Sequence, residues 1–458
     1  MAKLRILQKA WDPAWAHLNS GPGEHFVFFL ARHYPTPEGY VLVADEALLV
    51  GSGDVTFADP EWVVSAAALT SAINRALGSG RCLIEAHNHG AERPRFSFWD
   101  RAGLAEVVPY IHESIPGCPY GALVTGASEI YGELFDAHGG LAFDLISAVG
   151  QQLRILSADA GVPKSETADF DRQLRWLTTT GQRDLARLRF VVGGTGGTGA
   201  HAALGLAYLG ARRFVLMDPD CADRTSLHRL STARAGDAGK SKVALAAAAI
   251  QAVAPSAEVH ILQSRVEDPA ALAEAKMADV LVGCFDNDGA RAIWNELAVG
   301  YQIPLLDFGV GIHVDADGAV REAGGRIAWV LPEGPCLRCM RQIDRREVRD
   351  VLRSKTDRIM HQALGYVTGH RAPEASVYAL NAAVVNLGLT ELTLWLSGVR
   401  APEPFIEYDA LGFTRPRAGQ WLTPVSYTRN PRCIVCATAG VGDKLRLEAR
   451  YGHLHDVA

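Results

Sequence analysis

A glycine-rich turn between two apolar runs constrains the fold of this chain more than any other stretch. In "RFVVGGTGGTGAHAALGLAYLGARRFVLMD", an apolar strand ends at a G-x-G-G-x-G turn made by Gly194, Gly196, Gly197 and Gly199. A helix-forming run follows, and then a second apolar strand that ends at Asp218. This order predicts the opening of a doubly wound α/β sheet. The glycines permit a tight turn and let backbone N–H groups at a helix N-terminus approach phosphates.

The turn alone leaves the nucleotide open between NAD(P) or FAD and ATP, and an acidic Asp218 that accepts from ribose hydroxyls fits either. The surrounding residues favour ATP: Arg229 and Lys242 follow the second strand, Asp286 ends a later apolar strand, and Arg172 lies on an amphipathic helix upstream. A hydride-transfer enzyme has no need for several cations and a strand-end carboxylate. An adenylate-forming enzyme does, because it must offset phosphate charge and hold magnesium through oxygen ligands while pyrophosphate leaves.

The length of 458 residues predicts two or three domains. Up to about residue 140, "HFVFFLARHY", "GYVLVADEALLV" and "RCLIEAHNH" are typical of strands, whereas "PEWVVSAAALTSAINRALGSG" and "SFWDRAGLAEVVPYIHE" are typical of helices. We therefore expect an N-terminal α/β domain over residues 1–139. A connecting helix and linker are expected over 140–168, and a Rossmann-like α/β domain over 169–458.

Composition and charge narrow the functional classes. The chain is 48% hydrophobic and 21% charged, with a formal net charge of -6, which argues against general binding of nucleic acid. The N-terminus lacks the apolar core and cleavage site of a signal peptide. The most apolar long run, "VYALNAAVVNLGLTELTLWL", is interrupted by Asn381, Asn386 and Glu391, so it predicts a buried helix and not a membrane span. We expect a cytoplasmic protein that does not enter membranes.

Four of the eight cysteines form two C-x-x-C pairs, Cys336/Cys339 and Cys433/Cys436. In a cytoplasmic chain, paired thiolates indicate a metal clip before they indicate disulfides. Four thiolates complete a tetrahedral zinc shell without an open position, which predicts a structural role. The other four cysteines stand alone and are interpreted as small buried or partly buried residues: Cys82, Cys118, Cys221 and Cys284.

A second candidate metal site lies in "EAHNHGAERPRFSFWD", residues 85–100. His87 and His89 alternate along a strand end, so both side chains face one side and can share a metal. Asp100, about one helical turn after Ser97, is the candidate third ligand. Two histidines, a carboxylate and water form an open, catalytic zinc shell. The alternative is a pair of solvated histidines ahead of a helix that Ser97 caps.

Residues from Phe170 to about Ala437 resemble the ubiquitin-activating-enzyme-like (ThiF/MoeB-type) adenylyltransferases. The motifs "FDRQL", "GTGGTG", "DPD", "GKSK" and "GCFDN" occur in the family's order. The resemblance implies ATP and Mg²⁺ as cofactors and a structural zinc at the four paired cysteines. It implies that Arg172 is an arginine finger supplied by a second protomer, and hence a homodimer. It also implies roles in the nucleotide site: ribose for Asp218, phosphates for Arg229 and Lys242, magnesium for Asp286, and further contacts for the turn glycines, Asp220, Ser226 and Asn287.

Two departures from that family affect function. Ser226 stands where the family usually has asparagine, three residues before Arg229, and its shorter side chain predicts weaker ATP binding. The stretch "RQIDRREVRDVLRSKTDRIMHQALGYVTGHRAPEAS", where many members carry a nucleophilic cysteine, contains none. We therefore expect adenylation without a thioester on this chain. The acyl-adenylate would pass to another nucleophile or to the cysteine of a conjugating-enzyme-like partner.

The pattern H-x-H, seven residues, S-x-x-D resembles the JAMM (MPN-type) zinc metallopeptidases, over about Glu24 to Asp136. The resemblance implies an α/β/α domain in which His87, His89 and Asp100 hold zinc. Glu24, in "GPGEHFVFFLARHY", would be the general base, with Glu85 as the rival, and Ser97 would stabilise the water or oxyanion. The pattern departs from the family at residue 90, where glycine replaces proline.

Together the two resemblances predict a bifunctional enzyme. One half would adenylate the C-terminus of a ubiquitin-like or sulfur-carrier protein that ends in Gly-Gly, and the other would cleave bonds at such a C-terminus. Sulfur-carrier chemistry in biosynthesis is one alternative. A protein in which one half only docks the carrier is another, and a dinucleotide oxidoreductase is the last.

Overall fold

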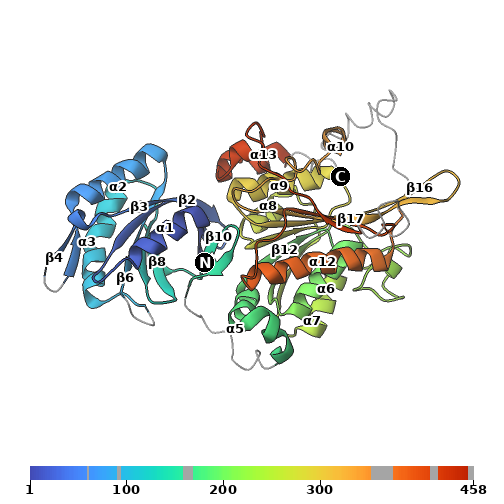
Figure 1. Cartoon of the computed structure of the whole chain (residues 1–458), viewed down its shortest axis with the longest axis horizontal. Coiled ribbons are helices and arrows are strands. Elements are labelled where there is room, and N and C mark those ends of the chain that lie inside the picture. The colour runs from blue at the N-terminus through green and yellow to red at the C-terminus, as the bar shows by residue number, and fades with distance from the viewer. Residues whose placement is uncertain (59–60, 90–93, 158–168, 352–374, 413–420, 452–458) are drawn as a thin grey trace. The chain divides into compact units, whose positions relative to one another are not determined.

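The computed structural model describes the 458-residue chain except for residues 59–60, 90–93, 158–168, 352–374, 413–420 and 452–458 (Figure 1). The chain forms two compact units, residues 1–161 and 162–458. Each unit has a large sheet of its own, so each is described separately. Residue 90, where the sequence departs from the metallopeptidase pattern, lies outside the described residues. So does most of the cysteine-free stretch, residues 341–376.

The first unit is built on a nine-stranded mixed sheet in the order β11-β10-β1-β3-β2-β6-β7-β8-β9. Its strands are β1 (Ala2–Leu7), β2 (Phe26–Thr36), β3 (Gly39–Leu49), β6 (Cys82–Asn88), β7 (Tyr120–Thr125), β8 (Ile130–Asp136), β9 (Gly139–Ala142), β10 (Leu145–Val149) and β11 (Leu153–Ile155). Strand β6 runs antiparallel to β2 and parallel to β7 near the middle of the sheet. The histidine motif at the end of β6 is therefore carried by a strand that is paired on both sides.

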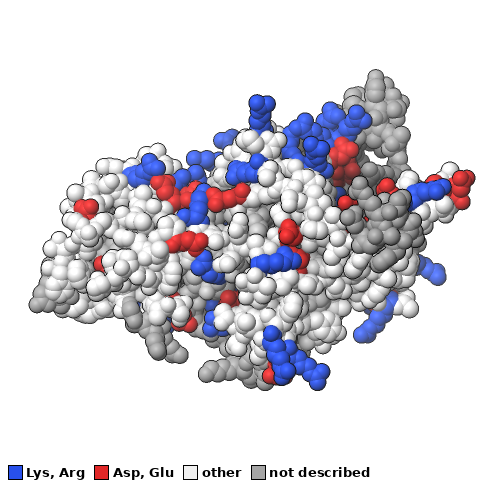
Figure 2. Space-filling model, in the orientation of Figure 1, with Lys and Arg blue, Asp and Glu red and all other residues white. Residues whose placement is uncertain are grey.

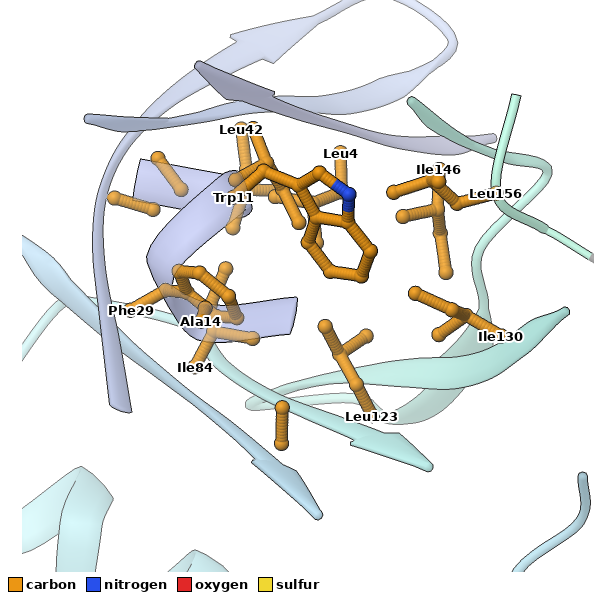
Figure 3. Close-up of a cluster of buried hydrophobic side chains, with 14 of the residues drawn as sticks. Leu4, Trp11, Ala14, Phe29, Leu42, Ile84, Leu123, Ile130, Ile146 and Leu156 are labelled. Carbon is orange, nitrogen blue, oxygen red and sulfur yellow. The ribbon is translucent and has the colours of Figure 1, made fainter. Parts of the chain in front are cut away.

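Helices cover both faces of this sheet, which gives three layers (Figure 1). Helix α1 (Gln8–Leu18) packs Trp11 into an apolar cluster with Leu4 and Phe29, drawn in Figure 3. Helices α2 (Ala66–Ser79) and α3 (Phe98–Ser114) supply residues to a second cluster on the other face. Burial on both faces fixes the register of the strands, because a one-residue slip would expose their apolar side chains.

Two expectations for this unit were wrong. The run from residue 61 was interpreted as helical throughout, but β5 (Glu61–Val64) pairs with β4 (Val55–Ala58) as a hairpin before α2 begins. The connecting helix expected after residue 140 is replaced by strands β9, β10 and β11. Strand β10 is buried and pairs in parallel with β1. A short apolar run of this kind is compatible with a strand and with a helix. Here it forms a strand because β1 is available as its pairing partner.

The second unit contains an eight-stranded sheet in the order β14-β13-β12-β15-β16-β17-β18-β19. Its strands are β12 (Arg189–Gly193), β13 (Arg213–Met217), β14 (Glu258–Leu262), β15 (Val280–Gly283), β16 (Leu305–Val314), β17 (Val320–Val330), β18 (Phe405–Asp409) and β19 (Leu422–Pro424). The five strands from β14 to β16 are parallel, and the order reverses between β12 and β15. The doubly wound sheet predicted from the glycine turn is present, and its switch point lies where such sheets bind ligands.

Helices lie on both sides of this sheet (Figure 1). They are α5 (Asp171–Arg187), α6 (Gly197–Leu209), α7 (Lys242–Val253), α8 (Pro269–Lys276), α9 (Asp288–Tyr301), α10 (Arg345–Val351), α12 (Tyr378–Leu396) and α13 (Leu447–Tyr451). Among the described residues, α12 is the one helix long and apolar enough to cross a membrane, yet 61% of its most apolar window is buried inside the protein. It packs against α6 and the sheet as a core helix. On the face drawn in Figure 2, basic and acidic side chains are interspersed, as is usual for globular domains.

The glycine turn between β12 and α6 is held by close backbone contacts. Gly194 has a φ of +81°, a left-handed conformation that favours glycine. A Cβ atom on Gly199 would lie 1.8 Å from the carbonyl oxygen of Gly194, whereas one on Gly196 would meet no atom within 4 Å. The first and last glycines are therefore needed for the fold of the turn. Gly196 instead borders open space.

This difference predicts opposite outcomes for two alanine substitutions. Gly199→Ala should lower the free energy of unfolding by about 3 kcal/mol, because the new methyl group overlaps backbone. Gly196→Ala is the matched control and should change it by less than about 0.5 kcal/mol. Urea unfolding of the full chain measures both values. Equal stability of the two variants would contradict the backbone contact.

Candidate nucleotide and metal sites

A cavity of about 1490 Å³ opens at the C-terminal ends of β12, β13 and β15, beside the glycine turn. It gathers residues from four separate loops, because parallel strands end at the same edge of the sheet. Nine residues predicted from the sequence line it: Gly194, Gly196, Gly197, Asp218, Asp220, Arg229, Lys242, Asp286 and Asn287. These nine residues combine backbone N–H groups at a helix N-terminus with two cations and three carboxylates, a set suited to a nucleotide phosphate chain and a metal ion.

Asp218 is fixed by the backbone at the end of β13. Its carboxylate accepts hydrogen bonds from the N–H groups of Thr195, at 2.7 Å, and Asp220, at 2.9 Å. Burial raises the pKa of Asp218, and the Lys242 ammonium 4.0 Å away opposes that rise. Lys242 also pairs with Asp220 at 2.8 Å. These contacts hold an acidic acceptor and a cation close together at the cavity wall.

Asp286 and Asn287 follow β15 and precede α9. The Asn287 side chain accepts a hydrogen bond from Ala290 N–H at 2.9 Å and so caps α9, while its amide nitrogen lies 3.2 Å from Asp286 Oδ1. Asn287 therefore positions the Asp286 carboxylate. That carboxylate is the type of oxygen ligand that magnesium prefers.

Three predicted nucleotide-site residues do not line the cavity. Gly199 packs against Gly194 behind the turn. Ser226 is buried in a turn in which its hydroxyl donates to the Asp223 carbonyl at 2.9 Å, so its short side chain is used locally. Arg172 is exposed on α5. Its expected role as an arginine finger needs a second protomer and stays a prediction.

Several residues of the cavity wall carry no motif that predicts their role. Asn381 was noted only as a polar interruption of an apolar helix, but it lies on α12 against the glycine turn, with its amide nitrogen 2.3 Å from the position of a Cβ on Gly197. A buried amide in an otherwise apolar helix is a usable signal for such a role. Arg326 on β17 also lines the cavity, and burial lowers the pKa of its guanidinium. Its strand carries no motif that singles it out.

The four paired cysteines come together in the second unit. Cys336 Sγ lies 3.8 Å from Cys339 Sγ and 3.7 Å from Cys433 Sγ, and Cys339 Sγ lies 3.5 Å from Cys436 Sγ. Four sulfurs at 2.3 Å from a tetrahedral zinc are about 3.8 Å apart. The cluster therefore fits a zinc ion with no open position, and it joins the segment after β17 to the segment before α13.

In the first unit, the structure brings His87, His89 and Asp100 together. The two Nε2 atoms are 3.1 Å apart, and each lies 3.3 Å from an oxygen of Asp100. Nitrogen and oxygen ligands of a tetrahedral zinc are about 3.3 Å apart, so the three groups fit one ion. Hydrogen bonding to Asp100 raises the pKa of His89. Burial opposes ionisation of Asp100, but hydrogen bonds from both histidines outweigh it and lower the pKa of that carboxyl.

Glu24 lies beside these three groups, with Oε1 3.8 Å from His89 Nε2. Its position depends on Asn88, whose side-chain oxygen accepts from His25 N–H at 2.6 Å and whose amide donates to the Gly23 carbonyl at 3.1 Å. Burial raises the pKa of Glu24. The rival, Glu85, is partly buried on β6 and lies beside Tyr120. Proximity to the histidines thus favours Glu24 over Glu85, and Asn88 is a positioning residue that the sequence analysis missed.

Ser97 forms a capping box with Asp100 at the start of α3. The Ser97 hydroxyl accepts from Asp100 N–H at 3.1 Å, and the Asp100 carboxylate accepts from Ser97 N–H at 2.5 Å. This is the helix cap that was the alternative interpretation of the motif, yet it also orients the carboxylate that faces both histidines. The cap and the metal-site interpretation are therefore compatible.

The two clusters predict separate losses of zinc. Replacing both Cys433 and Cys436 by serine should remove one zinc per chain, and His87→Ala should remove a different one, since each change deletes ligands from one shell. Native mass spectrometry counts the ions. Cys221→Ser, which alters an exposed cysteine outside both clusters, is the control and should leave the count unchanged. An unchanged count in either test variant would refute the corresponding site.

Comparison with known proteins finds relatives of the second unit. The model of the ThiF family matches residues 170–424. The SAMP-activating enzyme E1 of Haloferax volcanii is 28% identical over 261 residues, which cover 57% of this chain and 84% of that protein. The adenylyltransferase and sulfurtransferase MOCS3 of Drosophila willistoni is 26% identical over 206 residues, 44% of this chain and 43% of that protein. The match thus spans less than half of MOCS3.

Among solved structures, E. coli MccB aligns with a TM-score of 0.45 and 17% identity, over 61% of this chain and 73% of that one. The family match lies wholly within the second unit and includes the glycine turn, the cavity lining apart from Tyr427, and the cysteine pair Cys336/Cys339. Because it covers more than half of the chain, we conclude that this protein belongs to the ThiF family.

Proposed function

We propose that this protein adenylates the C-terminal carboxylate of a ubiquitin-like or sulfur-carrier protein with ATP, and that its first unit hydrolyses peptide or isopeptide bonds at such a C-terminus with zinc. The first activity rests on the cavity at the switch point of the second unit. The second rests on the convergence of Glu24, His87, His89 and Asp100. The family membership and the names of the relatives support the adenylation half alone.

The observation that carries the adenylation proposal is the size and lining of the cavity. At about 1490 Å³ it exceeds the ~300–1,000 Å³ usual for small-ligand pockets. Beyond the glycine turn it extends along β16 and β17, where its wall includes Gly309, Gly311, Gly324 and Gly325. These glycines alternate with residues that carry side chains, such as Val310 and Ile312, so the wall combines strand backbone with a few side chains and can accommodate a narrow peptide next to the nucleotide. A Gly-Gly tail is a peptide of that kind.

The residues suggest how the reaction proceeds. An oxygen of the carrier's terminal carboxylate attacks the α-phosphorus of ATP, the bond from that phosphorus to the bridging oxygen breaks, and pyrophosphate leaves. Arg229 and Lys242 offset the charge of the leaving group. Magnesium, when bound, neutralises phosphate charge through oxygen ligands, and Asp286 is positioned to hold it. Asp218 accepts from the ribose hydroxyls and fixes the nucleotide.

The acyl-adenylate is expected to leave this chain without first forming a thioester on it. The sequence has no cysteine between residues 341 and 376, so transfer goes directly to a nucleophile or to a partner's cysteine. The alternative is sulfur-carrier chemistry, in which the second unit activates a carrier protein for sulfur transfer and the first unit releases the group attached to the carrier. Arg172 would complete the site of a second protomer in a homodimer, which accords with its exposure on α5.

In the first unit, Glu24 would take the proton of the attacking water and pass it to the leaving amine. Burial raises the pKa of Glu24, which brings the carboxylate closer to the basicity that this task needs at neutral pH. Zinc, when bound by His87, His89 and Asp100, supplies Lewis acidity and lowers the pKa of water. Ser97 and Asn88 would act as positioning residues for Asp100 and Glu24.

Adenylation is tested with ATP–pyrophosphate exchange that depends on an added Gly-Gly carrier. Lys242→Ala should reduce the exchange rate on the order of 100-fold, because the cation lies in the cavity wall. Lys240→Ala is the matched control, since Lys240 is largely exposed and pairs with Asp237 outside the cavity; it should stay within about twofold of the wild type. Similar losses in both variants, or exchange without a carrier, would overturn the proposal.

Peptidase activity is tested with a carrier extended beyond its Gly-Gly terminus. His87→Ala should abolish cleavage together with one zinc. Glu24→Gln should abolish cleavage but keep the zinc, because the general base is not one of the three ligands. Glu85→Gln should cleave normally. A zinc-loaded wild type that binds the fusion without cutting it would instead make the first unit a docking module.

A further inference from the structure

A third group of metal-type ligands lies in the first unit, apart from the histidine motif. It consists of His33, Cys82 and Cys118, whose ligand atoms all lie within 4.8 Å of one another. Cys82 Sγ is 3.0 Å from His33 Nδ1. The sequence analysis interpreted Cys82 and Cys118 as isolated, partly buried residues, because nothing in their spacing of 36 residues connects them to each other or to His33.

The sheet topology brings these residues together. His33 is on β2, two residues beyond Ala31, which pairs with Cys82 at the first position of β6. Cys118 precedes β7, the other neighbour of β6. The cluster therefore connects three adjacent strands at the end of β6 opposite to His87. His87 is five positions after Cys82 on β6, about 17 Å along the strand, so the two groups cannot share an ion.

We propose that His33, Cys82 and Cys118 form a third zinc site. Two thiolates and an imidazole are donors that zinc prefers, and a sulfur and a nitrogen ligand of one tetrahedral zinc lie about 3.5 Å apart. The observed distance of 3.0 Å between Cys82 Sγ and His33 Nδ1 is shorter by about 0.5 Å, a difference that small side-chain rotations can close. Three protein ligands leave one position of the tetrahedral shell for water.

The surroundings favour a structural role for this ion. Cys82 is fully buried, and Cys118 packs against the apolar cluster that α2 and α3 form over the sheet. His33 and Cys118 are only partly buried, so an ion can reach the site from solvent. A zinc held here ties β2, β6 and the turn before β7 at one point and releases a proton from each thiol that binds.

Residue-resolved alkylation of the full-length wild type tests the site without any variant. With zinc bound, iodoacetamide should modify Cys118 at least tenfold more slowly than after treatment with a chelator and removal of the metal, because a ligated thiolate is a poorer nucleophile. Cys221, exposed and outside every cluster, is the internal control and should react equally in both samples. Equal reaction of Cys118 in both samples would overturn the proposal.

Metal content gives an independent readout. Cys118→Ser and His33→Gln should each bind one zinc fewer than the wild type, whereas Cys221→Ser should match it. Both test variants should keep the zincs of the four-cysteine cluster and of the histidine motif, which separates failure here from failure of the proposed peptidase. An unchanged zinc count, or a Cys82–Cys118 disulfide that persists in freshly purified protein without zinc, would refute the site.

Discussion

The contact between the backbones of Gly194 and Gly199 is the constraint on which the nucleotide cavity depends. Because those two residues have no side chains, the chain can leave β12, reverse and enter α6 within a few residues. The N-terminus of α6 is thereby placed at the switch point of the sheet. Asp218 and Asp286 follow the two strands that neighbour β12. Because parallel strands end at the same edge of a sheet, both residues line the cavity.

The histidine site of the first unit is organised differently. No strained turn is needed, because β6 holds His87 in register between β2 and β7, and His89 directly follows the last residue of that strand. The helix cap with Ser97 holds Asp100, and the side chain of Asn88 holds the backbone on either side of Glu24. Hydrogen bonds from neighbouring residues therefore orient both carboxylates. Such outer contacts usually fix the orientation of ligands in catalytic metal sites.

Short sequence motifs predicted those parts of the fold and of the sites that depend on residues close together in sequence. The glycine turn, the strand-end carboxylates and the paired cysteines each have a spacing with a physical meaning, and the structure brings them together. The connecting helix expected after residue 140 was wrong because the choice between helix and strand depended on a tertiary partner: β10 is a strand that pairs with β1. Arg326 and the group around Cys82 follow no motif and meet their neighbours only in the fold; Cys82 and Cys118, for example, are 36 residues apart in sequence. Asn381 carries a local signal as a polar residue in an apolar helix, but its position against Gly197, 184 residues away, also depends on the fold.

The four-cysteine cluster brings together distant parts of the second unit. Cys336 and Cys433 are 97 residues apart, and the segment between them contains α12, β18 and β19. Their sulfurs come together only in the folded chain, so a zinc ion at the cluster would bind the folded state and not the unfolded one. Its binding free energy would then add to the free energy of unfolding. Because α12 carries Asn381 against the glycine turn, loss of that ion would also weaken the wall of the nucleotide cavity.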